Sequence, residues 1–135
     1  MSRQAGFEAE NKRRIIIGSF VLSSGSFDAY YQKAQKARTL LIREFNNLFE
    51  HYDALIGPVA PEPAFKIGQN TDDPLKMYLE DVMTVPPSLA GLPAVSVPVG
   101  NTENGLPVGL QIIGKRRDDA QILAVARDVE AQRGQ

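Results

Sequence analysis

The sequence predicts an α/β fold, because amphipathic helical patterns are mixed along the chain with short apolar runs that suit strands. The clearest helical pattern runs from Asp28 to Tyr52, where apolar residues recur at three- and four-residue steps. The clearest strand pair is Ala94–Val99 and Gly109–Ile113, and the polar turn between them predicts a hairpin. The chain has 135 residues, enough for one compact domain with its own core.

The first helix is expected from about Glu8 to Leu22. Its middle, Ile15-Ile16-Ile17, is β-branched, so a strand remains an alternative there. The run Ser23-Ser24-Gly25-Ser26 ends the helix. By composition it resembles a nucleophile loop, but we interpret it as a turn between two helices.

In the second helix, Asp28 is expected to act as the N-cap through its carboxylate. The apolar stripe of this helix is interpreted as core packing rather than as a groove for a partner. The stripe consists of Tyr30, Ala34, Ala37, Leu41, Phe45, Leu48 and Tyr52. Next, Ala54–Gly57 suits a buried strand, and three prolines between residues 58 and 63 then force an irregular segment.

The second half of the chain is expected to contain two more helices around the hairpin. Asp73-Pro74 is a helix start, with an N-cap followed by proline, and Val85-Pro86-Pro87 is expected to end that helix after Met83. Pro98 favours an edge strand or a strand end. Asp118 or Asp119 is expected to cap the last helix. The apolar face of that helix consists of Ile122, Leu123, Val125, Ala126 and Val129.

Composition excludes several classes of function. The chain has no cysteine, which rules out disulfides, thiolate catalysis and thiolate metal sites. His51 is its one histidine, so a metal site or a Ser-His-Asp triad lacks partners, and we expect no metal. Fifteen basic and sixteen acidic residues give no support for a broad nucleic-acid-binding face. No apolar run approaches the roughly 20 residues that span a bilayer, and a cytoplasmic location is expected.

Two charged residues are candidates for ligand binding. Arg14 lies in a helix whose next residues are apolar, and Asp81 lies on a helix with a partly apolar face. A guanidinium holds a carboxylate with two parallel hydrogen bonds, and a carboxylate holds an ammonium. Together the two groups would bind both ends of a free amino acid. Judged from spacing alone, two solvated surface charges are the favoured interpretation.

Two long segments carry a resemblance to a known family. Leu89-Ala-Gly-Leu-Pro-Ala-Val-Ser-Val-Pro-Val-Gly100 and Asn104-Gly-Leu-Pro-Val-Gly-Leu-Gln-Ile-Ile-Gly114 resemble the C-terminal signature of the amidase-signature family. Three other segments, 12–15, 28–39 and 72–78, are similar to one branch of it, the A subunits of the aspartyl/glutamyl-tRNA amidotransferases. The resemblance implies that residues 1–135 form a partial amidase-signature domain. That α/β fold is a mixed, twisted sheet flanked by helices.

The resemblance also implies an activity. The A subunit of that branch hydrolyses glutamine, and the ammonia passes to the B subunit, which uses ATP and Mg²⁺ to amidate misacylated glutamyl- or aspartyl-tRNA. An arginine and an aspartate of the family hold the α-carboxylate and the α-ammonium of glutamine. These roles correspond to Arg14 and Asp81, with Arg13 as a competing carboxylate partner. The implied partners are the B and C subunits in a heterotrimer, glutamine, and misacylated tRNA through the complex; no membrane and no cofactor of the chain's own are expected.

The family's catalytic Ser–cis-Ser–Lys triad has no counterpart in this sequence. The resemblance therefore implies a fragment that lacks the N-terminal portion of the A subunit, is inactive alone, and exposes strand edges and an apolar face. Poor stability of the isolated chain is expected for the same reason. Two alternatives are a fragment of another amidase-signature hydrolase and a non-catalytic module derived from the fold.

Overall fold

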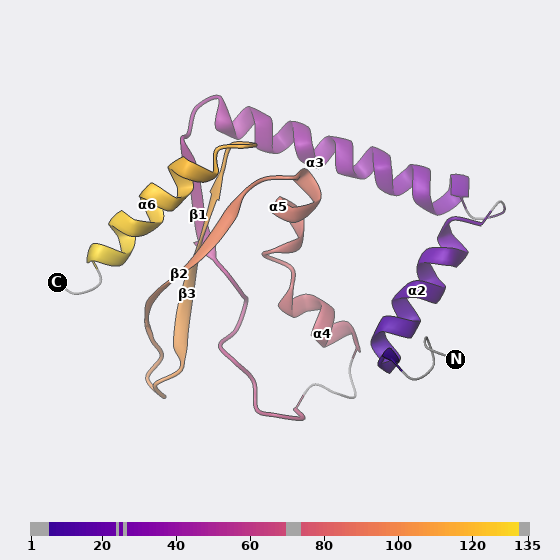
Figure 1. Ribbon diagram of the computed structural model, residues 1–135, viewed down its shortest axis with the longest axis horizontal. Coiled ribbons are helices and arrows are strands. Elements are labelled where there is room, and N and C mark those ends of the chain that lie inside the picture. Colours follow the sequence, from indigo (N-terminus) through magenta and orange to yellow (C-terminus); the bar gives the residue numbers. More distant parts are fainter. Residues whose placement is uncertain (1–5, 24, 26, 70–73, 133–135) are drawn as a thin grey trace. The chain divides into compact units, whose positions relative to one another are not determined.

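A computed structural model describes residues 6–23, 25, 27–69 and 74–132 of the chain. The described residues form two compact units, divided between Leu40 and Leu41. Helices and strands are mixed along the chain, which confirms the predicted α/β class (Figure 1). We describe each unit separately below.

The first unit contains helix α2 and the segment that follows it. Helix α2 spans Ala9–Val21, close to its expected bounds, and the alternative of a strand at the isoleucine run is wrong. A π-helical turn, η1, spans Phe27–Gln32. The ring of Phe20 lies 6.2 Å from that of Tyr30, which links the two elements. Neither element buries a residue, so local hydrogen bonds rather than a core account for their helical form.

Helix α3 spans Lys33–Phe49 and crosses the boundary between the two units. The prediction that Asp28 caps this helix is wrong, because Asp28 lies inside η1, where its carboxylate accepts a 2.6 Å hydrogen bond from Gln32 Nε2. The apolar stripe is packed only in part: Leu41 and Phe45 are half-buried, and other members are exposed. Tyr30, Leu48 and Tyr52 are 57%, 42% and 56% exposed. A stripe is buried only where a second apolar layer covers it, and the described sheet packs on a different helix.

The second unit is built on a three-stranded antiparallel sheet. Strand β1 spans Ala54–Pro58, β2 spans Ala94–Asn101 and β3 spans Pro107–Gly114, in the order β1-β3-β2. The predicted hairpin is confirmed, and β2 is an edge of this sheet, as Pro98 indicates. The register of β2 and β3 shifts between Pro98 and Gly100, where the proline removes a ladder donor. Strand β3 is central and pairs on both sides.

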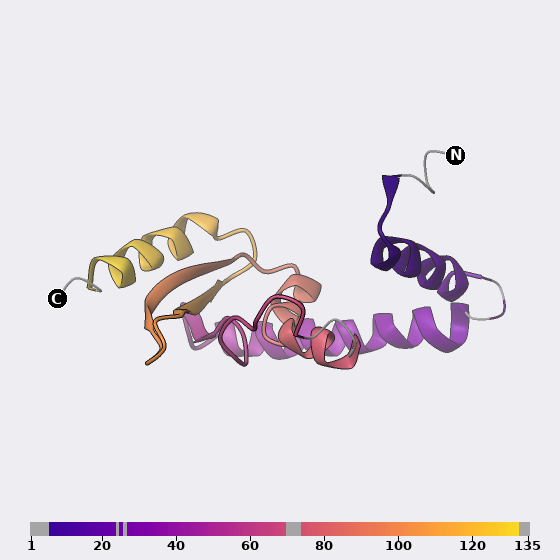
Figure 2. The same cartoon turned by 90° about the horizontal axis from the view of Figure 1, so that it is seen from below.

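One helix covers a face of the sheet and forms the core. Helix α6 spans Asp119–Gln132, and in Figures 1 and 2 it lies along one side of the strands. Its Ile122 and Ala126 pack with Val97 and Ile112, and Ile112 is completely buried. The prediction that Leu123 belongs to the packed face is wrong, because this side chain is 59% exposed. It is one residue beyond Ile122 and therefore about 100° around the helix.

Two short helices lie beside the sheet, on the opposite side of the strands from α6 (Figure 1). Helix α4 spans Pro74–Glu80 and α5 spans Val85–Ala90. Asp73, the expected N-cap of α4, lies outside the described residues. The prediction that this helix continues to Met83 and is ended by Val85-Pro86-Pro87 is wrong, because α4 already ends at Glu80. The two prolines lie in the first turn of α5, where their missing N–H groups would have no helical partner. Gly91 ends α5 with a φ of 72°, a left-handed conformation that suits glycine.

Candidate functional site

The candidate carboxylate-binding residue, Arg14, lies in the middle of α2 and faces solvent. Its Nε donates to Glu10 Oε1 at 3.1 Å, and the Arg14 side chain is 64% exposed. An exposed helical ion pair of this spacing contributes only about 0.3–0.5 kcal/mol. A guanidinium has five N–H donors, so the bond to Glu10 leaves capacity for a ligand carboxylate. The geometry of Arg14 is therefore compatible with carboxylate binding.

The competing residue, Arg13, has a similar environment. Its Nη1 donates to the other oxygen of the same carboxylate, Glu10 Oε2, at 2.9 Å, and its side chain is 50% exposed. Two guanidinium groups thus share one glutamate. Neither exposure nor hydrogen bonding separates Arg13 from Arg14, so the choice between them rests on the sequence resemblance.

The candidate ammonium-binding residue, Asp81, lies immediately after α4, in the turn that leads to α5. Its side chain is exposed. Its backbone carbonyl accepts bonds from the N–H groups of Thr84 and Val85, at 3.1 and 3.0 Å, and from Thr84 Oγ1 at 3.2 Å. These three bonds fix the backbone of the turn while the carboxylate stays open to solvent. An anchored backbone with an accessible charge is suited to binding a cation.

A residue that sequence reasoning did not single out, Gln111, ties this turn to the sheet. Gln111 is in the central strand β3 and is 6% exposed. Its Nε2 donates to the backbone carbonyl of Met83 at 3.0 Å, which joins positions 28 residues apart. The available signal was a polar residue inside the otherwise apolar run Gly109–Ile113. A buried amide in such a run needs a partner, and here the partner belongs to the Asp81 turn.

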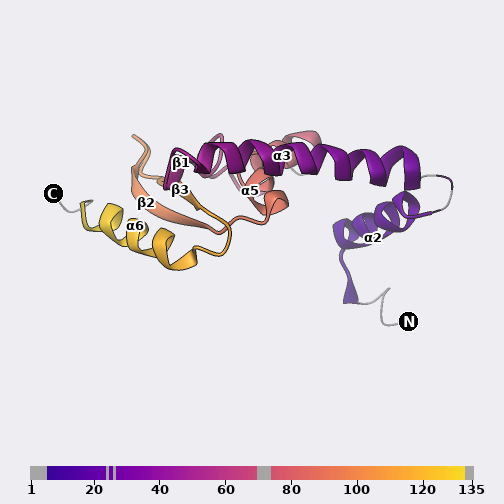
Figure 3. The ribbon, with the colours of Figure 1, turned by 90° about the horizontal axis from the view of Figure 1, so that it is seen from above.

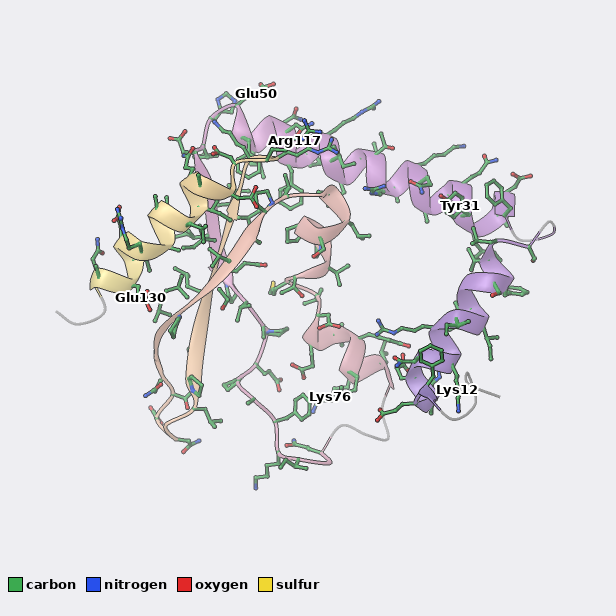
Figure 4. All side chains as sticks on the ribbon, in the orientation of Figure 1. Lys12, Tyr31, Glu50, Lys76, Arg117 and Glu130 are labelled. Atoms are coloured by element: carbon green, nitrogen blue, oxygen red, sulfur yellow. The ribbon has the colours of Figure 1, made fainter. Side chains whose placement is uncertain are left out.

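A hollow of about 300 Å³ lies beside helix α4. It is lined by Pro61, Glu62, Lys76, Leu79, Glu80 and Val82. Figure 4 shows one of these residues, Lys76, on α4. The lining mixes apolar side chains with both signs of charge, so the hollow shows no preference for one ligand chemistry.

Arg14 and Asp81 belong to different units, the first unit and the second. The structure describes each residue within its own unit, and the pairing of the two remains a prediction. What it does bring together is Asp81, Met83 and Gln111, all within the second unit.

The described residues contain no other assembled catalytic group. Ser23 Oγ donates to the carbonyl of Phe20 at 2.6 Å, which is a helix-end contact, while Ser24 and Ser26 lie outside the described residues. His51 is exposed just beyond the end of α3. In the described ranges no three His, Asp or Glu side chains are grouped to hold a metal ion.

No helix of the described chain is long and apolar enough to cross a lipid bilayer.

Comparison with known proteins identifies the family. The chain matches the family model described as Amidase over residues 1–123, which is most of its length. It therefore belongs to the amidase family, and the resemblance found in the two signature segments is confirmed. Its curated relatives include the A subunits of glutamyl-tRNA(Gln) amidotransferase from Brevibacillus brevis and Geobacillus kaustophilus. The first is 56% identical over 133 residues and the second 58% over 130 residues.

Solved structures support the same assignment. The A subunit of glutamyl-tRNA(Gln) amidotransferase from Thermotoga maritima is 45% identical, with a TM-score of 0.74 over 96% of this chain. A structure described as an amidase is 27% identical, with a TM-score of 0.74 over the same share. The similarity to the Thermotoga maritima structure is thus greater in sequence, while the fold is shared across the family.

The chain spans about a quarter of the length of these relatives. The match to the Brevibacillus brevis protein includes 98% of this chain but only 27% of that protein. The match to the Thermotoga maritima structure includes 28% of that chain. The relatives therefore contain a large part of the amidase fold that has no counterpart among these 135 residues.

Proposed function

We infer that this chain forms part of the glutamine-hydrolysing A subunit of a tRNA-dependent amidotransferase. The observation that carries the proposal is the identity of 54–58% to the A subunits of glutamyl-tRNA(Gln) amidotransferases, over 96–98% of the chain. Identity to an amidase of the same fold is 27%. A site that must accept one substrate is under tighter constraint than a fold, so this difference supports glutamine hydrolysis for the amidotransferase over another amidase activity.

In this proposal the chain binds the substrate but does not attack it. Arg14 binds the α-carboxylate of glutamine and Asp81 its α-ammonium, and the nucleophile, the base and the oxyanion donors come from the rest of the A subunit. Both side chains are exposed in the present chain, where a ligand can reach them. The isolated chain is consequently expected to have no glutaminase activity.

The proposed assembly has three different subunits. The B and C subunits complete the complex, and ATP and Mg²⁺ act in the B subunit, where ammonia released from glutamine amidates glutamate or aspartate attached to tRNA. This chain contributes no residue to that second reaction in our proposal. In our proposal this chain acts in the first of the two reactions, where it holds glutamine for hydrolysis.

The test is a chimaera in which this chain replaces the matching quarter of the Brevibacillus brevis A subunit, assembled with that organism's other subunits. We expect ammonia release from glutamine by the chimaera and none from the isolated chain. A chimaera that folds but hydrolyses only other amides would favour a different amidase activity. Turnover by the isolated chain would contradict the account of the missing triad.

A further inference from the structure

Gln111 is the single buried polar residue among the described parts of the chain. It is 6% exposed, and its neighbours along β3, Leu110 and Ile112, are apolar. A buried amide without hydrogen bonds would cost on the order of 1–3 kcal/mol, so its retention in a strand needs a compensating contact. The contact present is the 3.0 Å bond from Nε2 to the carbonyl of Met83.

The direction of the Gln111 side chain follows from the pleat of the strand. Successive residues point to opposite faces, and Ile112 belongs to the core under α6. Gly114, two residues further, is also on this face, since a Cβ there would meet the side chain of Ile122. Gln111 therefore points to the face away from α6, toward the side where α4 and α5 lie (Figures 1 and 3).

The bond from Gln111 is a long-range anchor for the turn after α4. The turn after α4 is closed by the contacts of the Asp81 carbonyl with Thr84 and Val85, all within four residues. The flanking helices have seven and six residues, too short to be stable by themselves. Met83 lies two residues from Asp81, so a bond that fixes Met83 to the sheet also limits the movement of the Asp81 backbone.

We propose that Gln111 is a positioning residue for ammonium binding by Asp81. It acts through Met83: the central strand holds the turn, and the turn presents the carboxylate to the substrate's ammonium group. Because a displacement of about 1 Å can cost a large factor in a binding site, the anchor matters even though Gln111 does not touch the substrate. The inference rests on the proposed function, since it assumes that Asp81 binds the ammonium.

The experiment uses the active chimaera and two variants, Gln111→Met and Asp81→Asn. Methionine keeps the length of the side chain and removes the N–H donor. Kinetics are measured with L-glutamine and with glutaramate, which keeps the amide and the carboxylate but has no α-ammonium. We expect Gln111→Met to raise KM for glutamine about 3- to 10-fold, the equivalent of one net hydrogen bond, with little change in kcat. KM for glutaramate should not change.

A double variant separates positioning from general damage. If Gln111 acts only through the Asp81 carboxylate, adding Gln111→Met to Asp81→Asn should raise KM for glutamine no further. An equal rise for glutamine and glutaramate with Gln111→Met would overturn the inference, because it would indicate a structural role. So would an unchanged KM with Gln111→Met while Asp81→Asn raises it. An unchanged KM with Asp81→Asn would instead overturn the proposed function itself.

Discussion

Helix α2 and strand β3 are both rich in isoleucine, but only β3 buries it. Ile112 is fully buried under α6, whereas Ile15, Ile16 and Ile17 are 48%, 69% and 51% exposed. Three consecutive residues point in three directions on a helix, so α2 has no single apolar face to pack. A strand with α6 on one side needs only alternate residues to be apolar. The second unit therefore forms a small core of its own, and the described residues of the first unit do not.

The two units differ in how much they depend on further packing. The first unit carries Arg14 on a helix without buried residues, and the second carries Asp81 on a turn anchored to a sheet. A helix of 13 residues is marginal in water without tertiary packing. We expect the apolar side chains of α2 to be covered in the intact protein, and poor stability of the first unit in the isolated chain.

The largest expected effect comes from removing the centre of the core. Ile112→Ala should lower the free energy of opening of the second unit by about 2–5 kcal/mol, because it leaves a cavity under α6. Ile16→Ala is the matched control and should change local stability by no more than about 0.5 kcal/mol. Amide hydrogen exchange of β3 and α2 measures both. Equal losses at the two positions would mean that the two units do not differ in the way described.

Replacing one glycine in each unit by alanine should give smaller changes in stability, and the two changes should have opposite signs. A Cβ at Gly114 would meet the Cγ2 of Ile122, so Gly114→Ala should destabilise the second unit by about 1–3 kcal/mol. Gly18, inside α2, has nothing within 4 Å of its Cβ position. Gly18→Ala should stabilise that helix by roughly 0.5–1 kcal/mol, because alanine loses less backbone entropy. Helical circular dichroism follows the second change, and hydrogen exchange of α6 the first. A neutral Gly114→Ala would show that the β3–α6 contact is looser than described.

The sequence predicted the elements better than their packing. Periodicity located α2, the hairpin and α6, because side-chain direction in a regular element follows from spacing alone. It misplaced the role of Pro86 and Pro87, since the same residues that end one helix are accepted in the first turn of the next. It also assigns the whole stripe of α3 to a core, whereas Tyr30, Leu48 and Tyr52 are exposed. Burial depends on which neighbours are present, and spacing does not specify them.

The site shows the same division. Arg14 and Asp81 came from the resemblance, and their environments are exposed and local. In the sequence, Gln111 stands out only as a polar residue in an apolar strand. Its partner is a backbone carbonyl 28 residues away. Every residue has a backbone carbonyl, so the residue type at position 83 does not identify the acceptor. Such a contact is recognised only in the folded structure.

The most direct test of the account uses glutamine analogues that each lack one charge. In the active chimaera, Arg14→Met should raise KM for glutamine and glutaramate, on the order of 10-fold or more for a lost charged hydrogen bond. It should leave KM for 4-aminobutanamide, which has no carboxylate, unchanged. Asp81→Asn should do the reverse: it should raise KM for glutamine and 4-aminobutanamide and leave KM for glutaramate unchanged. Arg13→Met tests the competing assignment, and we expect it to leave KM for all three amides unchanged. Crossed specificity of this kind is the predicted result, and equal effects of both variants on all three amides would contradict it.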